Sequence, residues 1–132
     1  CKGFAMERKI IATKNAPEAV GPYSQGIVAG NFLFCSGQIP IDPSTGNHIK
    51  GSPKEQAQQC LKNLKGIIEE AGAVLEDVVK VTIYLTSMEF FKEVNEVYAT
   101  FFTQNPPARA TVAVVGLPLG FNVEMDAIVL LK

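Results

Sequence analysis

Two charged side chains stand in segments that are otherwise suited to a protein core. Arg109 lies at the head of one apolar run, and Glu124 lies in the middle of a second run that ends at Leu131. An arginine can hold a carboxylate through two parallel hydrogen bonds, and a glutamate can take a proton from water or from a substrate. Either side chain could instead face solvent from a half-buried strand. The pair therefore indicates either a site for a small anionic substrate or two solvated surface charges.

Spacing alone does not bring Arg109 and Glu124 together. We interpret the two runs as strands joined at residues 116–120, and in an antiparallel hairpin the residues on one face pair with a constant index sum. A turn centred on Pro118 gives an even sum, whereas the indices of Arg109 and Glu124 add to an odd number. The two residues share one site only if the loop holds an even number of residues, a bulge intervenes, or they come from different subunits.

Four further residues could contribute to such a site. Tyr23 lies in a loop rich in proline and glycine, where its phenol is either a surface group or part of a lid. Ser36 and Gly37 end an apolar segment, and they either offer a hydroxyl and a closely approaching backbone N–H or form a plain strand end. Asn95 lies beside the apolar stripe of a helical segment, where an amide is either solvated or part of a site.

The composition describes one folded domain, which we assign to residues 1–132. Hydrophobic residues make up 47% of the chain and charged residues 19%, so disorder is not expected. The formal net charge is -1 and no run of Lys or Arg occurs, which argues against a nucleic-acid partner. No apolar run reaches the length of a membrane span. We take residues 1–5, before Met6, to be an N-terminal extension or a cloning remnant.

Cysteine and histidine usage argues against several kinds of site. The three cysteines, Cys1, Cys35 and Cys60, form no CxxC pair, and their odd number favours a reducing compartment, either the cytoplasm or the mitochondrion. Cys60 falls on the apolar face of a predicted helix, so we expect a core thiol rather than a reactive one. His48 is the only histidine and lies in a turn-like stretch. Neither a histidine-rich metal site nor a Ser-His-Asp triad is therefore expected.

The pattern of apolar residues predicts the element order β-β-β-α-β-α-β-β. Gly30-Asn31 marks a tight turn between the second and third strands. The clearest helix begins at Ser52, whose capping box includes Glu55, and ends at Gly72. A second helix follows the cap Ser87. The remaining expected strands cover residues 7–13, residues 78–86 and the two C-terminal runs.

The strand at residues 78–86 alternates strictly, so its two faces can be assigned. We expect Val79, Val81, Ile83 and Leu85 on one face and Lys80, Thr82, Tyr84 and Thr86 on the other. The whole pattern predicts an α+β fold, an antiparallel or mixed sheet with two helices packed on one face. The other sheet face still carries apolar residues, which invites a closed homo-oligomer with sites between subunits.

Three stretches, in the right order, resemble the RidA/YjgF family of enamine/imine deaminases. They are APEAVGPYSQGIVAGNFLFCSGQIPIDPSTG at residues 16–46, VNEVYATFF at residues 94–102 and PPARATVAVVGLPLGFNVEMDAI at residues 106–128. The last stretch carries the family signature: a small residue before Arg, an apolar strand, then Leu-Pro and a Glu-Met or Glu-Ile pair. The resemblance covers nearly the whole chain, from Ile10 to Lys132.

The resemblance implies a chorismate-mutase-like subunit, a homotrimer, and active sites in clefts between subunits. It also implies hydrolysis of reactive 2-imino acids, such as 2-iminopropanoate and 2-iminobutanoate, to 2-oxo acids and ammonia. Such imino acids form when dehydratases that use pyridoxal phosphate release 2-aminoacrylate or its homologues. The expected ligand is thus a small imino or 2-oxo acid, with no metal, no organic cofactor, no membrane and no nucleic acid as partner.

Position by position, the resemblance assigns Arg109 to the substrate carboxylate and Glu124 to the attacking water, with Tyr23 as a further catalytic residue. The substrate-binding positions correspond to Ser36, Gly37, Asn95 and Thr111. Thr111 stands where many members have Cys. The family role there resembles a backbone N–H contact to the carboxylate, which Thr still supplies, so a covalent mechanism through a thiol at this position is untenable.

Two other functions stay open beside the deaminase. The family has also been described as containing endoribonucleases and translation inhibitors, although this chain shows no basic stripe and no histidine pair. A ligand-binding or chaperone-like trimer without turnover is the other alternative. Some relatives lack the arginine, and Arg109 argues against that subgroup.

Overall fold

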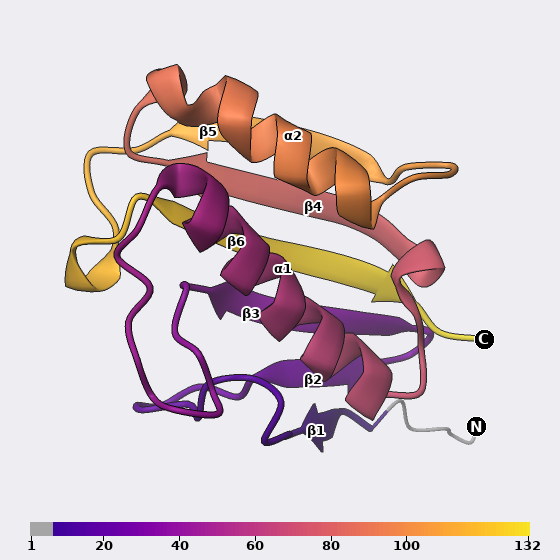
Figure 1. Ribbon diagram of the computed structural model, residues 1–132. Helices are drawn as coiled ribbons and strands as arrows, with labels where there is room; N and C mark the ends of the chain where they lie inside the picture. Colours follow the sequence, from indigo (N-terminus) through magenta and orange to yellow (C-terminus); the bar gives the residue numbers. More distant parts are fainter. Residues whose placement is uncertain (1–6) are drawn as a thin grey trace.

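The computed structural model describes residues 7–132, so the expectation about residues 1–5 lies outside the described part. The elements follow the predicted order. The strands are β1 (Lys9–Ile11), β2 (Gly26–Ala29), β3 (Phe32–Gln38), β4 (Val78–Leu85), β5 (Ala108–Ala113) and β6 (Val123–Leu130). The helices α1 (Pro53–Glu70) and α2 (Phe91–Phe101) cover one face of the sheet (Figure 1), which confirms the α+β fold.

The sheet is mixed, and its last strand in sequence lies in its middle. The strand order is β1-β2-β3-β6-β4-β5. Strand β6 is antiparallel to both β3 and β4, whereas β4 and β5 are parallel. Helices α1 and α2 therefore connect parallel strands, and such crossovers are right-handed. Because both crossovers step in the same direction across the sheet, they bring α1 and α2 to the same face.

Strands β5 and β6 do not form a hairpin, so the predicted pairing around Pro118 is wrong. Strand β4 lies between them and pairs with both. The connecting segment contains a short 3-10 turn, η3 (Pro118–Gly120). The physical reason is burial: Val123, Met125 and Val129 of β6 are 0% exposed, which a central position between β3 and β4 provides.

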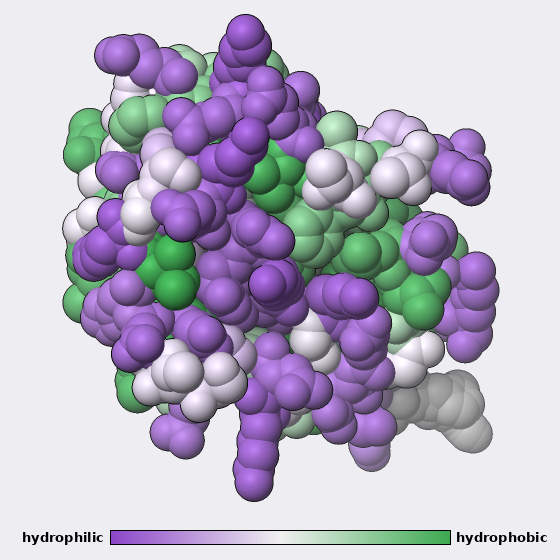
Figure 2. Space-filling model, in the orientation of Figure 1, coloured by the Kyte–Doolittle hydropathy of each residue, from purple (hydrophilic) through white to green (hydrophobic). Residues whose placement is uncertain are grey.

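The sheet face opposite the helices, here called the open face, carries a row of apolar side chains. Residues in register on neighbouring strands point to the same face, and Ile10, Ile27, Phe34 and Ile128 are in register across β1, β2, β3 and β6. Ile10 is 61% exposed and Phe34 45% exposed. The helix side differs, since hydrophilic side chains predominate along α1 there (Figure 2). The open face thus exposes apolar side chains in the isolated chain.

Helix α1 begins and ends as predicted. The Glu55 backbone N donates to Ser52 Oγ at 3.2 Å, and the Ser52 backbone N donates to Glu55 Oε1 at 2.8 Å, which completes the capping box. Gly72 follows the helix with a φ of 85°. Gly66, in mid-helix, lowers helix stability by about 1 kcal/mol relative to alanine, but a Cβ there would collide with the backbone of Asn15. Gly66 therefore lets the loop before β2 pack directly on α1.

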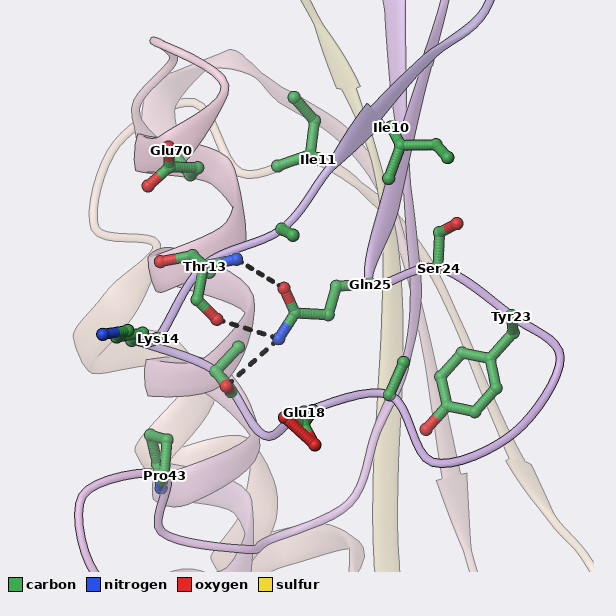
Figure 3. Close-up of a pocket in the computed structure, with 13 residues that line it drawn as sticks. Ile10, Ile11, Thr13, Lys14, Glu18, Tyr23, Ser24, Gln25, Pro43 and Glu70 are labelled. Atoms are coloured by element: carbon green, nitrogen blue, oxygen red, sulfur yellow. Dashed lines mark hydrogen bonds between the residues drawn. The ribbon is translucent and has the colours of Figure 1, made fainter.

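A buried amide fixes that loop, which carries Tyr23. Gln25 is 5% exposed, and its Oε1 accepts from the Thr13 backbone N at 2.6 Å. Its Nε2 lies 3.0 and 3.1 Å from the carbonyl oxygens of Thr13 and Ala16 (Figure 3). The same nitrogen lies 2.7 Å from the carbonyl oxygen of Pro17. The side chain at the end of the loop thus bonds backbone groups at its start.

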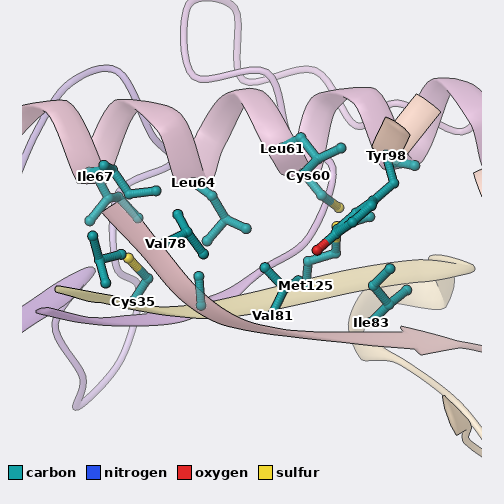
Figure 4. Packing of buried hydrophobic residues seen from close by; sticks show 14 of the residues in the cluster. Cys35, Cys60, Leu61, Leu64, Ile67, Val78, Val81, Ile83, Tyr98 and Met125 are labelled. Atoms are coloured by element: carbon teal, nitrogen blue, oxygen red, sulfur yellow. The ribbon is translucent and has the colours of Figure 1, made fainter. Parts of the chain in front are cut away.

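The core lies between the helices and the sheet (Figure 4). Its members from α1 include Cys60, Leu61, Leu64 and Ile67, and those from the sheet include Leu33, Val81, Ile83 and Met125; all of these are no more than 2% exposed. Burial of one such aliphatic side chain stabilises the fold by roughly 1.5–3 kcal/mol. The predicted apolar face of the helix is confirmed, with Cys60 as a core thiol.

Three expected details differ from the structure. Strand β1 covers only Lys9–Ile11, shorter than the expected 7–13. Val79 is 38% exposed, because a register shift after Val78 puts Val78 (5% exposed) on the core face in its place. Ser87 caps a 3-10 turn, η2 (Met88–Phe90), which precedes α2.

We expect Gln25→Leu to lower the free energy of unfolding by about 2–4 kcal/mol, since it leaves buried backbone groups without partners. Urea titration at fixed protein concentration measures this change. Gln58→Leu is the matched control, because Gln58 lies exposed on α1, and there the change should stay within about 0.5 kcal/mol. Equal effects of the two substitutions would contradict the role given to Gln25.

Candidate active site

Glu124 lies on the open face of β6, against the end of β3. Val123 and Met125, its neighbours in sequence, are 0% exposed on the core face, as the alternation predicted. A Cβ at Gly37 would occupy the space of the Glu124 carboxyl group. Gly37 is therefore the residue that makes room for this carboxylate. Gly37 and Glu124, with the neighbouring Tyr84 and Asp126, form what we call the carboxylate half-site.

The environment of Glu124 favours its protonated form. Partial burial, followed by the charge of Asp126, raises the pKa of Glu124 above its usual range. Its in-register partner on β4 is Tyr84. A carboxylate with a raised pKa is a better match to proton transfer near neutral pH than a solvated one. The half-site can thus act as an acid or a base.

Ser36 connects the carboxylate half-site to the Tyr23 loop. Its hydroxyl donates to the Ser24 carbonyl at 2.5 Å, and its backbone N donates to the Gln25 carbonyl at 2.9 Å. Ser36 therefore holds the loop beside Gly37. Tyr23 is 52% exposed, so its phenol is accessible to a ligand or to a second chain.

Arg109 belongs to a separate cluster, here called the guanidinium half-site, at the outer edge of the sheet. Its Nη1 donates to Asn95 Oδ1 of α2 at 2.7 Å. The guanidinium carbon lies 4.8 Å from the ring centre of Tyr98 and 5.6 Å from that of Phe91. A cation over aromatic faces is held in place and partly shielded from water. This arrangement leaves other N–H groups of Arg109 free to hold an anion.

Thr111 lies on the same face of β5 as Arg109, two residues further along. It is in register with Ile83, which is 1% exposed and faces the helices. Its Oγ1 is buried and finds no hydrogen-bond partner within residues 7–132. Thr111 therefore belongs with the guanidinium half-site.

The two half-sites do not meet within one chain. Arg109 is in register with Val81, which is 0% exposed on the helix-covered face. Glu124 is in register with Tyr84, whose side chain is on the open face. The structure thus places Gly37 against Glu124 and joins the preceding residue, Ser36, to the Tyr23 loop. It brings Asn95 to Arg109 and puts Thr111 on the same face of β5. Because β5 and β6 form no hairpin, Arg109 and Glu124 could share one site only if they came from different subunits.

A hollow of about 770 Å³ lies along β1 and the loop that follows it. Figure 3 shows Tyr23, Ser24, Lys14 and Glu70 among the residues around it. Arg109 and Glu124 do not line it. Tyr23 lines it, together with Ser24 and Gln25, the two residues whose carbonyl groups accept from Ser36.

No metal site is evident in the described part of the chain, because no three His, Cys, Asp or Glu side chains cluster there. Burial, together with the charge of Asp126, raises the pKa of Cys35 to about 12, and burial, together with the charge of Glu124, raises the pKa of Cys60 well above its usual range. Neither thiol forms a disulfide within residues 7–132, and both stay protonated near neutral pH. Among the described residues, neither helix combines the length and apolar character that a membrane span requires.

Four residues of the two half-sites were not identified as site residues from the sequence. Asp126 follows Glu124 by two positions, so strand alternation could have placed both on one face. Tyr84 was on the predicted polar face of its strand. Phe91 and Tyr98 flank Asn95 at helical spacing, which puts all three on one face of α2. Their apolar character made them core candidates instead.

The sequence model of the Endoribonuclease L-PSP family matches residues 13–131. A RutC family protein of Pyrococcus horikoshii is 53% identical over 121 residues, which cover 92% of this chain and 96% of that protein. The 2-iminobutanoate/2-iminopropanoate deaminase of Mus musculus is 46% identical over 121 residues, covering 92% and 90%. The crystal structure of the YjgF gene product from E. coli superposes with a TM-score of 0.89 at 43% identity, covering 94% of this chain and 99% of that one. The chain therefore belongs to the Endoribonuclease L-PSP family, which confirms the resemblance to RidA/YjgF proteins.

Proposed function

We propose that this chain is an enamine/imine deaminase, which hydrolyses 2-imino acids such as 2-iminopropanoate and 2-iminobutanoate to 2-oxo acids and ammonia. The observation that carries the proposal is the pair of half-sites: Arg109 is arranged to hold an anion, and Glu124 to exchange a proton. A mouse relative 46% identical to this chain bears the name of this activity. The free thiols of Cys35 and Cys60 support a reducing compartment, and we propose the cytoplasm.

A homotrimer with sites between subunits would join the half-sites. Arg109 and Glu124 face opposite sides of the sheet, so a molecule as small as pyruvate reaches both only when two chains contribute. The apolar row through Phe34 and Ile128 offers the kind of surface that closed oligomers bury. We propose that each site takes Arg109 from one subunit and Glu124 from its neighbour.

The proposed reaction begins with orientation of the substrate. Arg109 holds the carboxylate through two N–H groups, which presents C2 of the protonated imine in one direction. The hydrogen bond to Asn95 and the rings of Tyr98 and Phe91 keep the guanidinium from turning. The proposed cleft is completed by the other positions that the resemblance to RidA/YjgF proteins assigns to it: Tyr23, Ser36, Gly37 and Thr111.

Glu124 then acts as the general base and the general acid. Its carboxylate takes a proton from water while the water oxygen bonds to C2, and the C=N double bond becomes a single bond. The resulting carbinolamine carries a hydroxyl and an amino group on C2. Glu124 returns its proton to the amino nitrogen, the C–N bond breaks, and ammonia leaves. The hydroxyl oxygen forms the new carbonyl and gives up its proton through the carboxylate to solvent. No metal or organic cofactor enters these steps.

Endoribonuclease activity is the second candidate, because the matching family carries that description. Its active site would need to bind a phosphodiester with acid–base groups on both sides. The net charge of -1 does not favour a polyanion. His48, the only histidine, packs beside the Phe121 ring at a centroid distance of 5.5 Å and belongs to neither half-site. A trimer that binds a small ligand without turnover is the third candidate.

Arg109→Ala should lower kcat/KM for 2-iminopropanoate by about 100-fold or more, because the carboxylate loses its partner. The kcat/KM of Arg109→Lys should lie between those of Arg109→Ala and the unsubstituted protein, with a raised KM, since lysine keeps the charge and loses the paired N–H groups. Ammonia and pyruvate release in a dehydratase-coupled assay measures both. The matched control is Arg8→Ala, the other arginine of the sequence. Full turnover by Arg109→Ala would refute the deaminase assignment.

Glu124→Gln should lower turnover by about 100-fold or more, because an amide cannot take a proton from water. Pyruvate binding, measured by calorimetry, should change far less. In the unsubstituted protein, activity should fall as the pH drops through the raised pKa of Glu124, because protonation removes the base. Normal deamination by Glu124→Gln would exclude Glu124 as the base. Ribonuclease activity that persists in both Arg109→Ala and Glu124→Gln would come from a contaminant or from another site.

Phe34→Asp should dissociate the proposed trimer, since it places a charge in the apolar row of the open face. Sedimentation velocity gives the mass of the species, and circular dichroism checks that the chain stays folded. Val74→Asp, at another exposed apolar residue beyond the end of α1, is the control and should leave the mass unchanged. A trimer of normal mass and affinity in Phe34→Asp would argue against assembly through the open face.

A further inference from the structure

A tyrosine and a second carboxylate stand directly beside Glu124. Asp126 follows Glu124 by two positions on β6, so both side chains are on the open face. Tyr84 is in register with Glu124, and its hydroxyl donates to Asp126 Oδ2 at 2.9 Å. The phenol therefore lies diagonally across β4 and β6 and borders both carboxylates. The deaminase mechanism described above uses neither Tyr84 nor Asp126.

The hydrogen bond has a defined direction. Burial, then the hydrogen bond to Asp126, then the charges of Asp126 and Glu124 raise the pKa of the Tyr84 phenol above its ordinary value. The phenol thus keeps its proton and donates it to the Asp126 carboxyl group. A hydrogen bond to a carboxylate holds the acceptor in place. Tyr84 therefore fixes the position of Asp126 next to Glu124.

No other charge among the described residues contacts Glu124. Beyond Tyr84, the next position in register on β5 is the apolar Val112, and on the β3 side the carboxyl group lies against Gly37. Cys60 of α1 lies behind the strand on the core face, and its thiol is neutral. Lys80 is on the open face, in register with Ile128, and forms no ion pair with either carboxylate.

We propose that Asp126, held by Tyr84, is a positioning residue that strengthens Glu124 as the base of the reaction. This inference rests on the proposed deaminase function. A negative charge beside a carboxyl group favours the uncharged form of that group. Glu124 therefore takes a proton from water more readily than an isolated carboxylate does, and it holds that proton until the amino group of the carbinolamine receives it. The guanidinium half-site holds the substrate carboxylate and leaves the proton transfers to this trio.

The test compares pH profiles of kcat for single variants. Asp126→Asn should move the acid limb to lower pH by about one unit and lower the plateau several-fold, because Glu124 becomes a weaker base. Tyr84→Phe should move the limb in the same direction by less, since Asp126 keeps its charge and loses its orientation. Asp126→Glu, which restores the charge, should bring the limb back toward its original position. Glu76 precedes the start of β4, at the end of the strand away from Tyr84, so Glu76→Gln should leave the profile unchanged.

A second measurement does not depend on activity. The carboxyl carbon of Glu124 can be titrated by NMR in glutamate-labelled protein without ligand, and its midpoint should fall in Asp126→Asn and stay in Glu76→Gln. An unchanged midpoint, or a shifted midpoint with an unmoved acid limb, would overturn the proposed role of Asp126. Absence of deaminase activity in the unsubstituted protein would instead count against the proposed function, so the two failures are distinguishable.

Discussion

Strand β6 enters the sheet between β3 and β4, and these pairings determine where each reactive side chain points. With both edges paired, β6 buries Val123, Met125 and Val129 against the helices and directs Glu124 to the opposite face. The same insertion leaves β5 at the outer edge, paired only with β4. Arg109 consequently faces α2 at the rim, where Asn95 can reach it. A different partner for β6 would reverse faces or expose the core.

Each half-site is built by a different physical means. One hydrogen bond orients the guanidinium, and packing against two aromatic rings limits its movement. Gly37 leaves room for the Glu124 carboxyl group. Partial burial and the charge of Asp126 both raise its pKa. The first arrangement suits permanent charge, and the second suits a group that must gain and lose a proton. This contrast is the physical basis of the division of labour that we propose.

Local features of the structure could be predicted from the sequence, and pairings between distant segments could not. The capping box at Ser52 and the turn at Gly30 depend on neighbouring residues, so their signals are contained in a few positions. The exposure of Val79 depends on a bulge set by pairing with β6, which no local pattern encodes. The alternation around Glu124 gave its face correctly, but which strand lies next to it depends on the whole sheet. Residue type and position made Arg109 and Glu124 candidates, but their roles, and Thr111 as a further site residue, came from family resemblance, because an arginine and a glutamate in apolar strands are also common on plain surfaces.

The placement of Arg109 and Glu124 on opposite faces also bears on abundance. A lone subunit holds a guanidinium and a carboxylate that cannot act on the same small molecule. Under the function that we propose, a newly made chain would therefore be inert until it joined other copies. With sites shared between neighbours, as we propose, catalytic capacity would fall more steeply than protein level whenever the chain becomes scarce enough to dissociate. Dilution, and not only inhibition, would then be a way of switching the activity off.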